Sequence, residues 1–418
     1  MMPAANPAKP LTPALAPFQV RSFRFQWPAD LATSVGFETE ALILGWYILS
    51  ATGSVEYLVA FGSLTWIGAV FSPFFGIAAD RYGVRNFLCA TRAVYAALAG
   101  LVMALTLADA LEPWHVLAIY GAAALTRPSE TAMRALLVGY TMRPQAMMGA
   151  LGLSRTTVDL AKVAGAFAGA GGVALVGMGP AYVLVTGLYV TAFALSLGLA
   201  RTPIHKAHAA AIVVGLKDAA RHVWTKHDLL GAFTVALVIN LLAFPFFLGL
   251  LPYAAKSVYD IGQSGLGYLA GAFALGSLAG SLVLGASTMR LRAGRAMVAS
   301  AALWFLVLFT FGQTRALPLG LALLFLSGVL QSFCVTPLAT VILRGASPDM
   351  RGRVMGMRIL AIWGLPLGLL ASGPLIAYAG YSACTALYAT AGLAATTLIA
   401  MRWRSALWDT TAAANTHP

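Results

Sequence analysis

The stretch Gly76-Ile-Ala-Ala-Asp80-Arg81-Tyr-Gly83-Val-Arg85 is the most informative part of the sequence, because it sets a polar, glycine-bearing loop between two long apolar runs. Gly83 permits a tight turn, since glycine adopts backbone conformations that other residues resist. The Asp80 carboxylate can accept hydrogen bonds at a helix N-terminus or pair with an arginine, and Arg81 and Arg85 can clamp helix ends of another half of the chain. We interpret the stretch as a polar latch that holds one face of the molecule shut.

The apolar runs recur along the whole chain. Of the 418 residues, 60% are hydrophobic and 10% are charged, whereas soluble domains average about a quarter charged residues. Helix-length apolar runs lie at 31–50, 56–79, 87–107, 115–137, 146–175, 181–200, 229–251, 265–288, 296–313, 317–343, 354–379 and 382–401. A spanning helix needs about 20 apolar residues and satisfies its own backbone hydrogen bonds. The sequence therefore predicts an all-α membrane protein with twelve transmembrane helices.

The basic residues predict how these helices are oriented. The net charge is +13, and 19 of the 27 Lys and Arg residues fall in the termini and on alternate loops, against two, Lys256 and Arg315, on the opposite loops. Because cytoplasmic loops carry the excess of Lys and Arg, both termini are expected in the cytoplasm. The excess of Lys and Arg is thus explained by the orientation of the helices in the membrane, and no nucleic-acid partner is expected. We expect a multi-pass protein of a bacterial-type inner membrane, most simply a monomer in the lipid bilayer.

The chain divides into two halves with matching features. We expect a cytoplasmic tail at 1–28, a six-helix bundle at 29–200, a cytoplasmic linker with an amphipathic helix at 201–228, a second six-helix bundle at 229–402, and a tail at 403–418. Gly76 and Gly285, like Pro128 and Pro337, are 209 residues apart. The pattern indicates two pseudo-symmetric bundles, the parallel-repeat arrangement of one class of transporters.

Enzyme and metal chemistry find no support in the sequence. The three cysteines lie within apolar runs at spacings that do not suit a metal site, and the histidines avoid those runs except at the edge of one. No clustered nucleophile is present either. We therefore expect no enzyme activity, no metal and no cofactor.

Ionisable residues inside the predicted helices are the best pointers to function, because each costs roughly 2.5–3.5 kcal/mol to insert. They are confined to the first half, where they include Glu38, Glu40, Arg127, Glu130 and Asp159; the second half holds the neutral Asn240 and Gln331 at similar depth. These seven are the candidate residues for proton coupling and the substrate cavity. Arg127 could serve a substrate anion or a proton relay. Asp159, with Arg155 and Lys162 on one helix face, favours a structural charge network.

Glu38 and Glu40 cannot both face one cavity, since residues two apart point about 200° from each other on a helix. We favour Glu38 for the cavity, because Asp30 and Ser34 align loosely with it. Burial disfavours a charged carboxylate, so such a group can load a proton on one side and release it on the other. A structural ion pair with Arg127 is the alternative.

The loop motif and several further segments resemble the major facilitator superfamily. The segments FRFQWPADLATSVGFETEAL (23–42), DAARHVWTKHDLL, GLGYLAGAFALGSLAGSLVLG and SPDMRGRVMGMR resemble its macrolide-efflux-like and siderophore-exporter branch. The resemblance implies two six-helix bundles, alternating access and proton-driven export. It also places Gly76, Asp80, Arg81, Gly83, Arg85, Arg134, Arg351, Gly352 and Arg353 at a cytoplasmic gate, with Arg134 as a candidate partner of Asp80. The second half has Met289 where the first has Asp80, so the latch is asymmetric.

Two functions stay open at this point. The first is proton-coupled export of a small amphipathic molecule, such as a drug or a siderophore-like metabolite. The alternative is a proton-coupled uptake symporter for a small metabolite, which predicts more Asn, Gln, Trp and His on the first, fourth, seventh and tenth helices than this sequence has. In both cases the partners are a small-molecule substrate and protons.

Overall fold

The computed structural model describes residues 16–142, 144–202, 220–286, 292–346, 354 and 361–408, and the regular elements in them are helices. The first half holds η1 (Ala16–Gln19), α1 (Arg21–Thr52), α2 (Val55–Leu64), α3 (Gly68–Tyr82), α4 (Val84–Leu107), α5 (Pro113–Ala124), α6 (Arg127–Thr141), α7 (Pro144–Ala166), η2 (Phe167–Gly171), α8 (Gly172–Val176) and α9 (Met178–Ser196). Helix α1 begins eight residues before position 29, the expected start of the first bundle.

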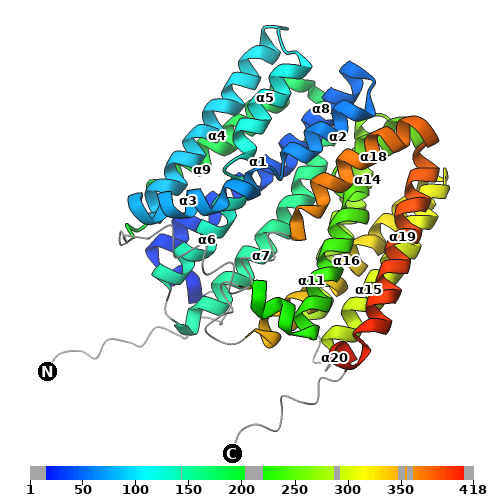
Figure 1. Cartoon of the computed structure of the whole chain (residues 1–418). Coiled ribbons are helices and arrows are strands. Elements are labelled where there is room, and N and C mark those ends of the chain that lie inside the picture. The colour runs from blue at the N-terminus through cyan, green and yellow to red at the C-terminus, as the bar shows by residue number, and fades with distance from the viewer. Residues whose placement is uncertain are drawn as a thin grey trace, which may run out of the picture.

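The second half follows the linker, of which residues 203–219 lie outside the described part and residues 220–225 are helical. It holds α11 (His227–Leu242), α12 (Phe244–Leu248), α13 (Leu251–Tyr253), η3 (Ala254–Val258), α14 (Gln263–Ala286), α15 (Ala293–Gln313), α16 (Leu317–Gly345), α18 (Gly364–Ala379), α19 (Tyr381–Arg402) and α20 (Arg404–Trp408). The α1–α9 half and the α11–α20 half lie side by side (Figure 1).

Six of the described helices are long and apolar enough to cross a membrane, namely α4, α9, α14, α15, α16 and α19. Several of the other predicted spans are broken into shorter helices. The run at 56–79 is divided between α2 and α3, the run at 115–137 between α5 and α6, and the run at 229–251 between α11, α12 and α13. Prolines stand in the first turn of α6, α12 and α13, where a missing N–H costs no helix hydrogen bond.

Glycines make the turn and the close contact that the sequence predicts for them. Gly83 joins α3 to α4 with a φ of 86°, in the region that favours glycine. Gly276 of α14 lies directly against the carbonyl of Phe325 in α16, so that a Cβ at this position would overlap the α16 backbone. The small residue thus allows α14 and α16 to approach closely.

The two halves contact each other at the end where α1 stops and α2 begins, which we call the closed end. There α2 packs against α18, and α1 packs against α13. Lys256 Nζ of η3 donates a hydrogen bond to the carbonyl of Leu49 at 3.2 Å, and Ser63 Oγ donates to the carbonyl of Pro366 at 3.3 Å. Deeper between the halves, α7 and the π-helical η2 pack against α14. These contacts bring the charges of the first half next to the apolar core of the second.

Candidate functional site

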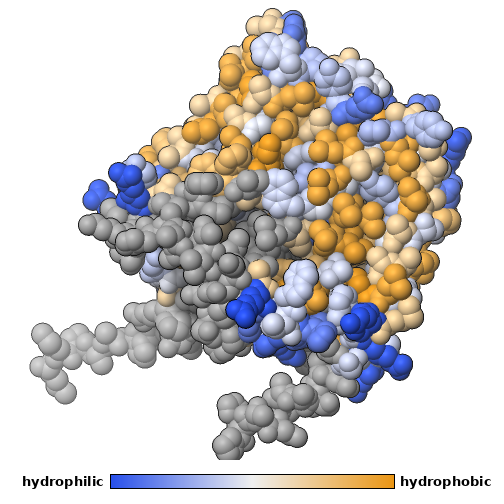
Figure 2. Space-filling view, viewed as in Figure 1, coloured by the Kyte–Doolittle hydropathy of each residue, from blue (hydrophilic) through white to orange (hydrophobic). Residues whose placement is uncertain are grey.

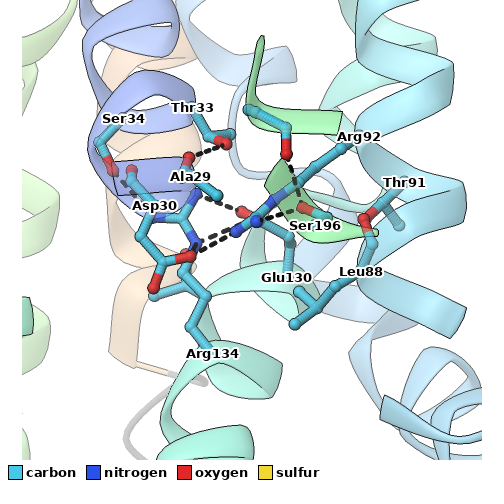
Figure 3. Close-up of polar contacts among 12 residues, drawn as sticks. Ala29, Asp30, Thr33, Ser34, Leu88, Thr91, Arg92, Glu130, Arg134 and Ser196 are labelled. Carbon is cyan, nitrogen blue, oxygen red and sulfur yellow. Dashed lines mark hydrogen bonds and ion pairs between the residues drawn. The ribbon is translucent and has the colours of Figure 1, made fainter. Parts of the chain in front are cut away.

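A network of four buried charges joins α1, α4 and α6 (Figure 3). Asp30 and Glu130 supply the carboxylates, and Arg92 and Arg134 supply the guanidinium groups; Arg92 and Glu130 are fully buried. Arg92 pairs with Asp30, and its Nη2 lies 3.0 Å from Glu130 Oε1. Arg134 Nη2 lies 2.7 Å from Glu130 Oε2. Two positive and two negative charges therefore balance within a buried site, as buried charges require.

Serine hydroxyls complete this network. Arg92 Nη1 donates to Ser196 Oγ of α9 at 2.6 Å, and Arg134 Nη1 donates to Ser34 Oγ of α1 at 2.8 Å. Each arginine therefore has partners on several helices, which fixes the helices relative to one another. We interpret the network as the structural brace of the first half.

The network includes two of the predicted site residues. Glu130, a candidate for proton coupling, has two guanidinium partners inside the bundle. Arg134, a gate candidate, is buried with Glu130 one turn away on α6, where i,i+4 spacing brings the two side chains together, and the side chain of its candidate partner Asp80 lies outside the described residues. Sequence reasoning missed Arg92, although a lone arginine inside the apolar run 87–107 is itself a signal for a buried acidic partner.

A second cluster surrounds Glu40. Arg127 Nη2 lies 2.5 Å from Glu40 Oε2, and Tyr189 donates a hydrogen bond to the same oxygen at 2.9 Å. The Arg127 guanidinium stands over the rings of Phe37 and Tyr120, with its Cζ at 4.2 and 4.4 Å from the ring centroids. Carboxylate and aromatic partners together compensate the buried cation. Arg127 thus pairs with Glu40, not with Glu38.

Glu38 lies in different surroundings from Glu40, as their spacing on α1 indicates. It lines a cavity of about 90 Å³ at the contact between the two halves, together with Lys162 of α7. Lys162 Nζ lies 3.9 Å from Asp159 Oδ1, and its side chain is 19% exposed. No carboxylate–cation contact within ion-pair distance involves Glu38 among the described residues. The cavity therefore holds one acid and one base that do not pair directly with each other.

Most of the cavity wall is apolar. The first half contributes Ala41, Leu42, Gly45, Leu58, Phe61, Gly62, Thr65 and Tyr120, and the second half contributes Phe247, Leu248, Gly249, Leu251, Pro252, Ala270 and Ala274. Phe247 is held by stacking on Phe273 at 5.0 Å and on Trp304 at 5.7 Å between ring centroids. Gly165 of α7 lies against the Cβ of Glu38, so the small residue sets how closely α7 approaches α1. The acid is thus placed by helix packing.

Two neutral candidates lie away from this cavity. Asn240 Nδ2 donates to the carbonyl of Ala236 within α11, at 2.8 Å. Gln331 is buried in α16, and its Oε1 has no hydrogen-bond partner among the described residues. Neither lines the cavity with Glu38. Of the seven candidates, Glu38 lines the cavity, Glu40 and Arg127 form a pair, and Asp159 lies beside Lys162.

The loop motif is only partly within the described side chains. Arg81 is exposed, and its guanidinium lies over the ring of Tyr82 at 5.6 Å. Arg85 Nη2 donates to the carbonyl of Leu197 at 2.7 Å, at the end of α9. Arg85 therefore caps a helix of its own half, not of the other half as expected, because α9 packs alongside α4. The helix backbone at Gly76 and Asp80 belongs to α3.

The remaining gate candidates cannot be placed. The side chain of Asp80, and Arg351, Gly352 and Arg353, lie outside the described residues. Within the described part of the chain, no three His, Cys, Asp or Glu residues are grouped to hold a metal ion.

A model of the Major Facilitator Superfamily matches residues 31–366, and the chain belongs to this family. It is a multi-pass membrane protein with the fold of secondary transporters.

Solved structures agree on the fold at low sequence identity. A bacterial homolog of the human lysosomal transporter Spinster, inward-facing and unoccupied, is 13% identical with a TM-score of 0.70, over 92% of this chain and 96% of that one. The nucleoside transporter NupG is 14% identical with a TM-score of 0.70, over 92% and 99%. The human organic anion transporter MFSD10 (TETRAN) is 16% identical with a TM-score of 0.63, over 91% and 99%. No curated protein matches the sequence significantly.

Proposed function

We propose that the chain exports a small amphipathic molecule in exchange for protons, by alternating access at the cavity around Glu38. The observation that carries this proposal is a carboxylate without an ion-pair partner, set in a largely apolar cavity between the two halves. A carboxylate at such a site is costly when charged, so its neutral, protonated form is favoured until a substrate cation or solvent replaces the proton.

The cavity wall supports an amphipathic substrate. Phe247, Leu251 and Pro252 offer apolar contact from the second half, while Glu38 and Lys162 offer two opposite charges from the first. A molecule with an apolar body and a cationic group fits this wall, because the cation competes with the proton for Glu38 and the body displaces water from the apolar residues.

We extend the proposal to the transmembrane topology and to the branch of the family. Each of the twelve predicted spans overlaps a described helix or broken helix, and the uneven distribution of Lys and Arg supports cytoplasmic termini. We propose twelve spans, a monomer in a bacterial-type inner membrane, and a place in the macrolide-efflux-like and siderophore-exporter branch, on the segments that resemble it.

The test is a flux assay in sealed vesicles with an imposed pH gradient. Purified protein is reconstituted, a fluorescent amphipathic cation such as ethidium serves as the probe, and an external pH dye follows protons. We expect gradient-driven movement of ethidium opposite to the proton flow in the wild type. Glu38→Gln should abolish the response to the gradient and weaken ethidium binding, because a neutral amide can neither release a proton nor pair with a cation.

The matched control is Asp109→Asn, which removes a charge from an exposed residue whose φ of 52° asparagine also tolerates. Gradient-driven flux in Glu38→Gln at the wild-type rate would refute the coupling role. Probe and protons moving in the same direction would favour the uptake symporter instead.

A further inference from the structure

A groove rich in arginine lies at the end of the molecule opposite the closed end. It is formed where α20 folds back between the start of α15 and the end of α19, and its volume is about 440 Å³. Its lining residues are Arg295, Met401, Arg402, Arg404, Ser405 and Trp408. Leu407 anchors α20, because its buried side chain packs against Gly231 of α11 and its backbone against Gly294 of α15. The groove is therefore a fixed feature of the second half.

The arginines of this groove carry uncompensated charge. Arg295 and Arg404 both lie over the ring of Trp408, with Cζ at 5.3 and 5.1 Å from its centroid. Within the described residues, the guanidinium groups of Arg295, Arg402 and Arg404 make no ion pair or hydrogen bond. The ring holds two of these groups in place, and their N–H donors stay available to a ligand.

No acidic side chain is among the described residues that line the groove. Asp228, the acid at the start of the neighbouring α11, lies instead against Gly345 at the end of α16. Asp409 lies outside the described residues. Three guanidinium groups thus line the groove, and none of its described lining residues carries a negative charge.

We propose that this groove binds the headgroup phosphate of an anionic phospholipid. Planar guanidinium groups suit phosphate oxygens, and basic pockets at the ends of membrane helices bind acidic headgroups. A lipid is favoured over a soluble phosphate because Met401 and, one turn earlier on α19, Leu398 are 63% and 61% exposed. They offer an apolar track for acyl chains directly beside the charges. Figure 2 shows hydrophilic surface around α20 bordering a broad apolar surface.

The test measures contact between Trp408 and lipid in the full-length protein. The protein is reconstituted into phosphatidylcholine vesicles with a small fraction of brominated phosphatidylglycerol, or of brominated phosphatidylcholine as the neutral comparison. Bromine quenches nearby tryptophan fluorescence. Because the chain has nine tryptophans, the Trp408 signal is taken as the difference between wild type and Trp408→Phe. We expect stronger quenching of Trp408 by the anionic lipid.

Arginine variants test the charges. The double variant Arg295→Gln/Arg404→Gln should lower the preference for phosphatidylglycerol by more than tenfold, since each basic residue near an anionic surface contributes about fivefold. Arg402 does not stand over the Trp408 ring, so Arg402→Gln should lower the preference for phosphatidylglycerol by about fivefold without disturbing the ring contacts. This single variant tests the proposal even if the double variant does not fold. Arg315→Gln, exposed at the other end of α15, should leave the preference unchanged.

Three outcomes would overturn the proposal. Equal quenching by both lipids would show that the groove does not select the headgroup, and an unchanged preference in Arg402→Gln and the double variant would show that these arginines do not bind it. Reversal of the quenching by added inorganic phosphate would assign the groove to a soluble phosphate. None of these results depends on transport, so the proposed exchange function is tested separately.

Discussion

Replacing Arg92 with methionine removes the central cation of the Asp30–Arg92–Glu130–Arg134 network and keeps a long side chain in its place. Arg92 is fully buried and bonds to two carboxylates and to Ser196. Without it, Asp30 and Glu130 share one cation, Arg134, whose Nε lies 3.6 Å from Asp30. Breaking a buried pair from one side costs about 3–5 kcal/mol, because a charge is left uncompensated. We expect a loss of that size in the free energy of unfolding.

A double-mutant cycle separates charge balance from packing. Asp30→Asn alone leaves excess positive charge, whereas Arg92→Met/Asp30→Asn leaves Glu130 paired with Arg134 and no net charge. The double variant should therefore lose less stability than the sum of the two single variants, and this difference, the coupling energy, should be about 0.5–3 kcal/mol. Equilibrium unfolding of the purified protein in mixed micelles, by titration with sodium dodecyl sulfate, gives all three values.

Arg315→Gln is the reference for this cycle, since a change at an exposed arginine stays within about 0.5 kcal/mol. Additive losses in the cycle, or an Arg92→Met variant within about 1 kcal/mol of wild type, would refute the interpretation of the network as a brace of balanced charges.

Three further predictions follow from contacts between helices. Glu40→Gln should cost about 3–5 kcal/mol of stability, because Arg127 then stays buried without its carboxylate; unchanged unfolding in mixed micelles would contradict this. Lys256→Met should open the closed end, since a hydrogen bond with a charged donor is worth about 1.5–3 kcal/mol, or roughly tenfold or more in population. Longer spin-label distances between α1 and the start of α14 would show this, and Lys256→Arg is the control. Gly276→Ala should destabilise by about 1–3 kcal/mol through overlap with α16, whereas Gly139→Ala, with open space around it, should be neutral or stabilising; equal thermal stability of the two variants would refute the packing argument.

The arrangement of helices was largely predictable, and the breaks in them were not. Apolar runs indicate where chain enters a membrane, because every backbone group there needs a partner. They do not show where a helix ends and restarts, as between α5 and α6 at Leu125 and Thr126. Pro128 marks that position, but proline is also tolerated inside a helix, as at Pro337 of α16. Neighbouring helices decide between the two, and a single sequence does not describe them.

The sequence predicted which charged residues lie inside the helices, but only partly which of them pair with each other. Helical spacing separated Glu38 from Glu40, because the angle between residues on one helix is fixed by local geometry. Arg127 could have paired with either acid from the sequence alone. The choice of Glu40 depends on how α6 and α9 stand beside α1, including the tyrosine at position 189. Arg85 shows the same limit, since its partner on α9 is 112 positions away in sequence.

The first half is held together by buried charges and the second by aromatic packing, and this difference affects how the protein tolerates substitutions. In the first half, the charges of the Asp30–Arg92–Glu130–Arg134 network and of the Glu40–Arg127 pair have particular partners, so a substitution there either keeps the hydrogen bonds or leaves a charge in an apolar interior. In the second half, Trp304, Phe273 and Phe247 are held by ring packing, which accepts other side chains of similar volume. In a library of random substitutions, the stability of variants at the buried charges of α1, α4 and α6 should therefore be either kept or lost. In α12, α14 and α15, stability should fall gradually as side-chain volume departs from that of the original residue. Under the proposed function, the part of the cavity wall that the second half contributes lies on the tolerant side, so substitutions there should change the range of molecules carried and leave the charged half intact.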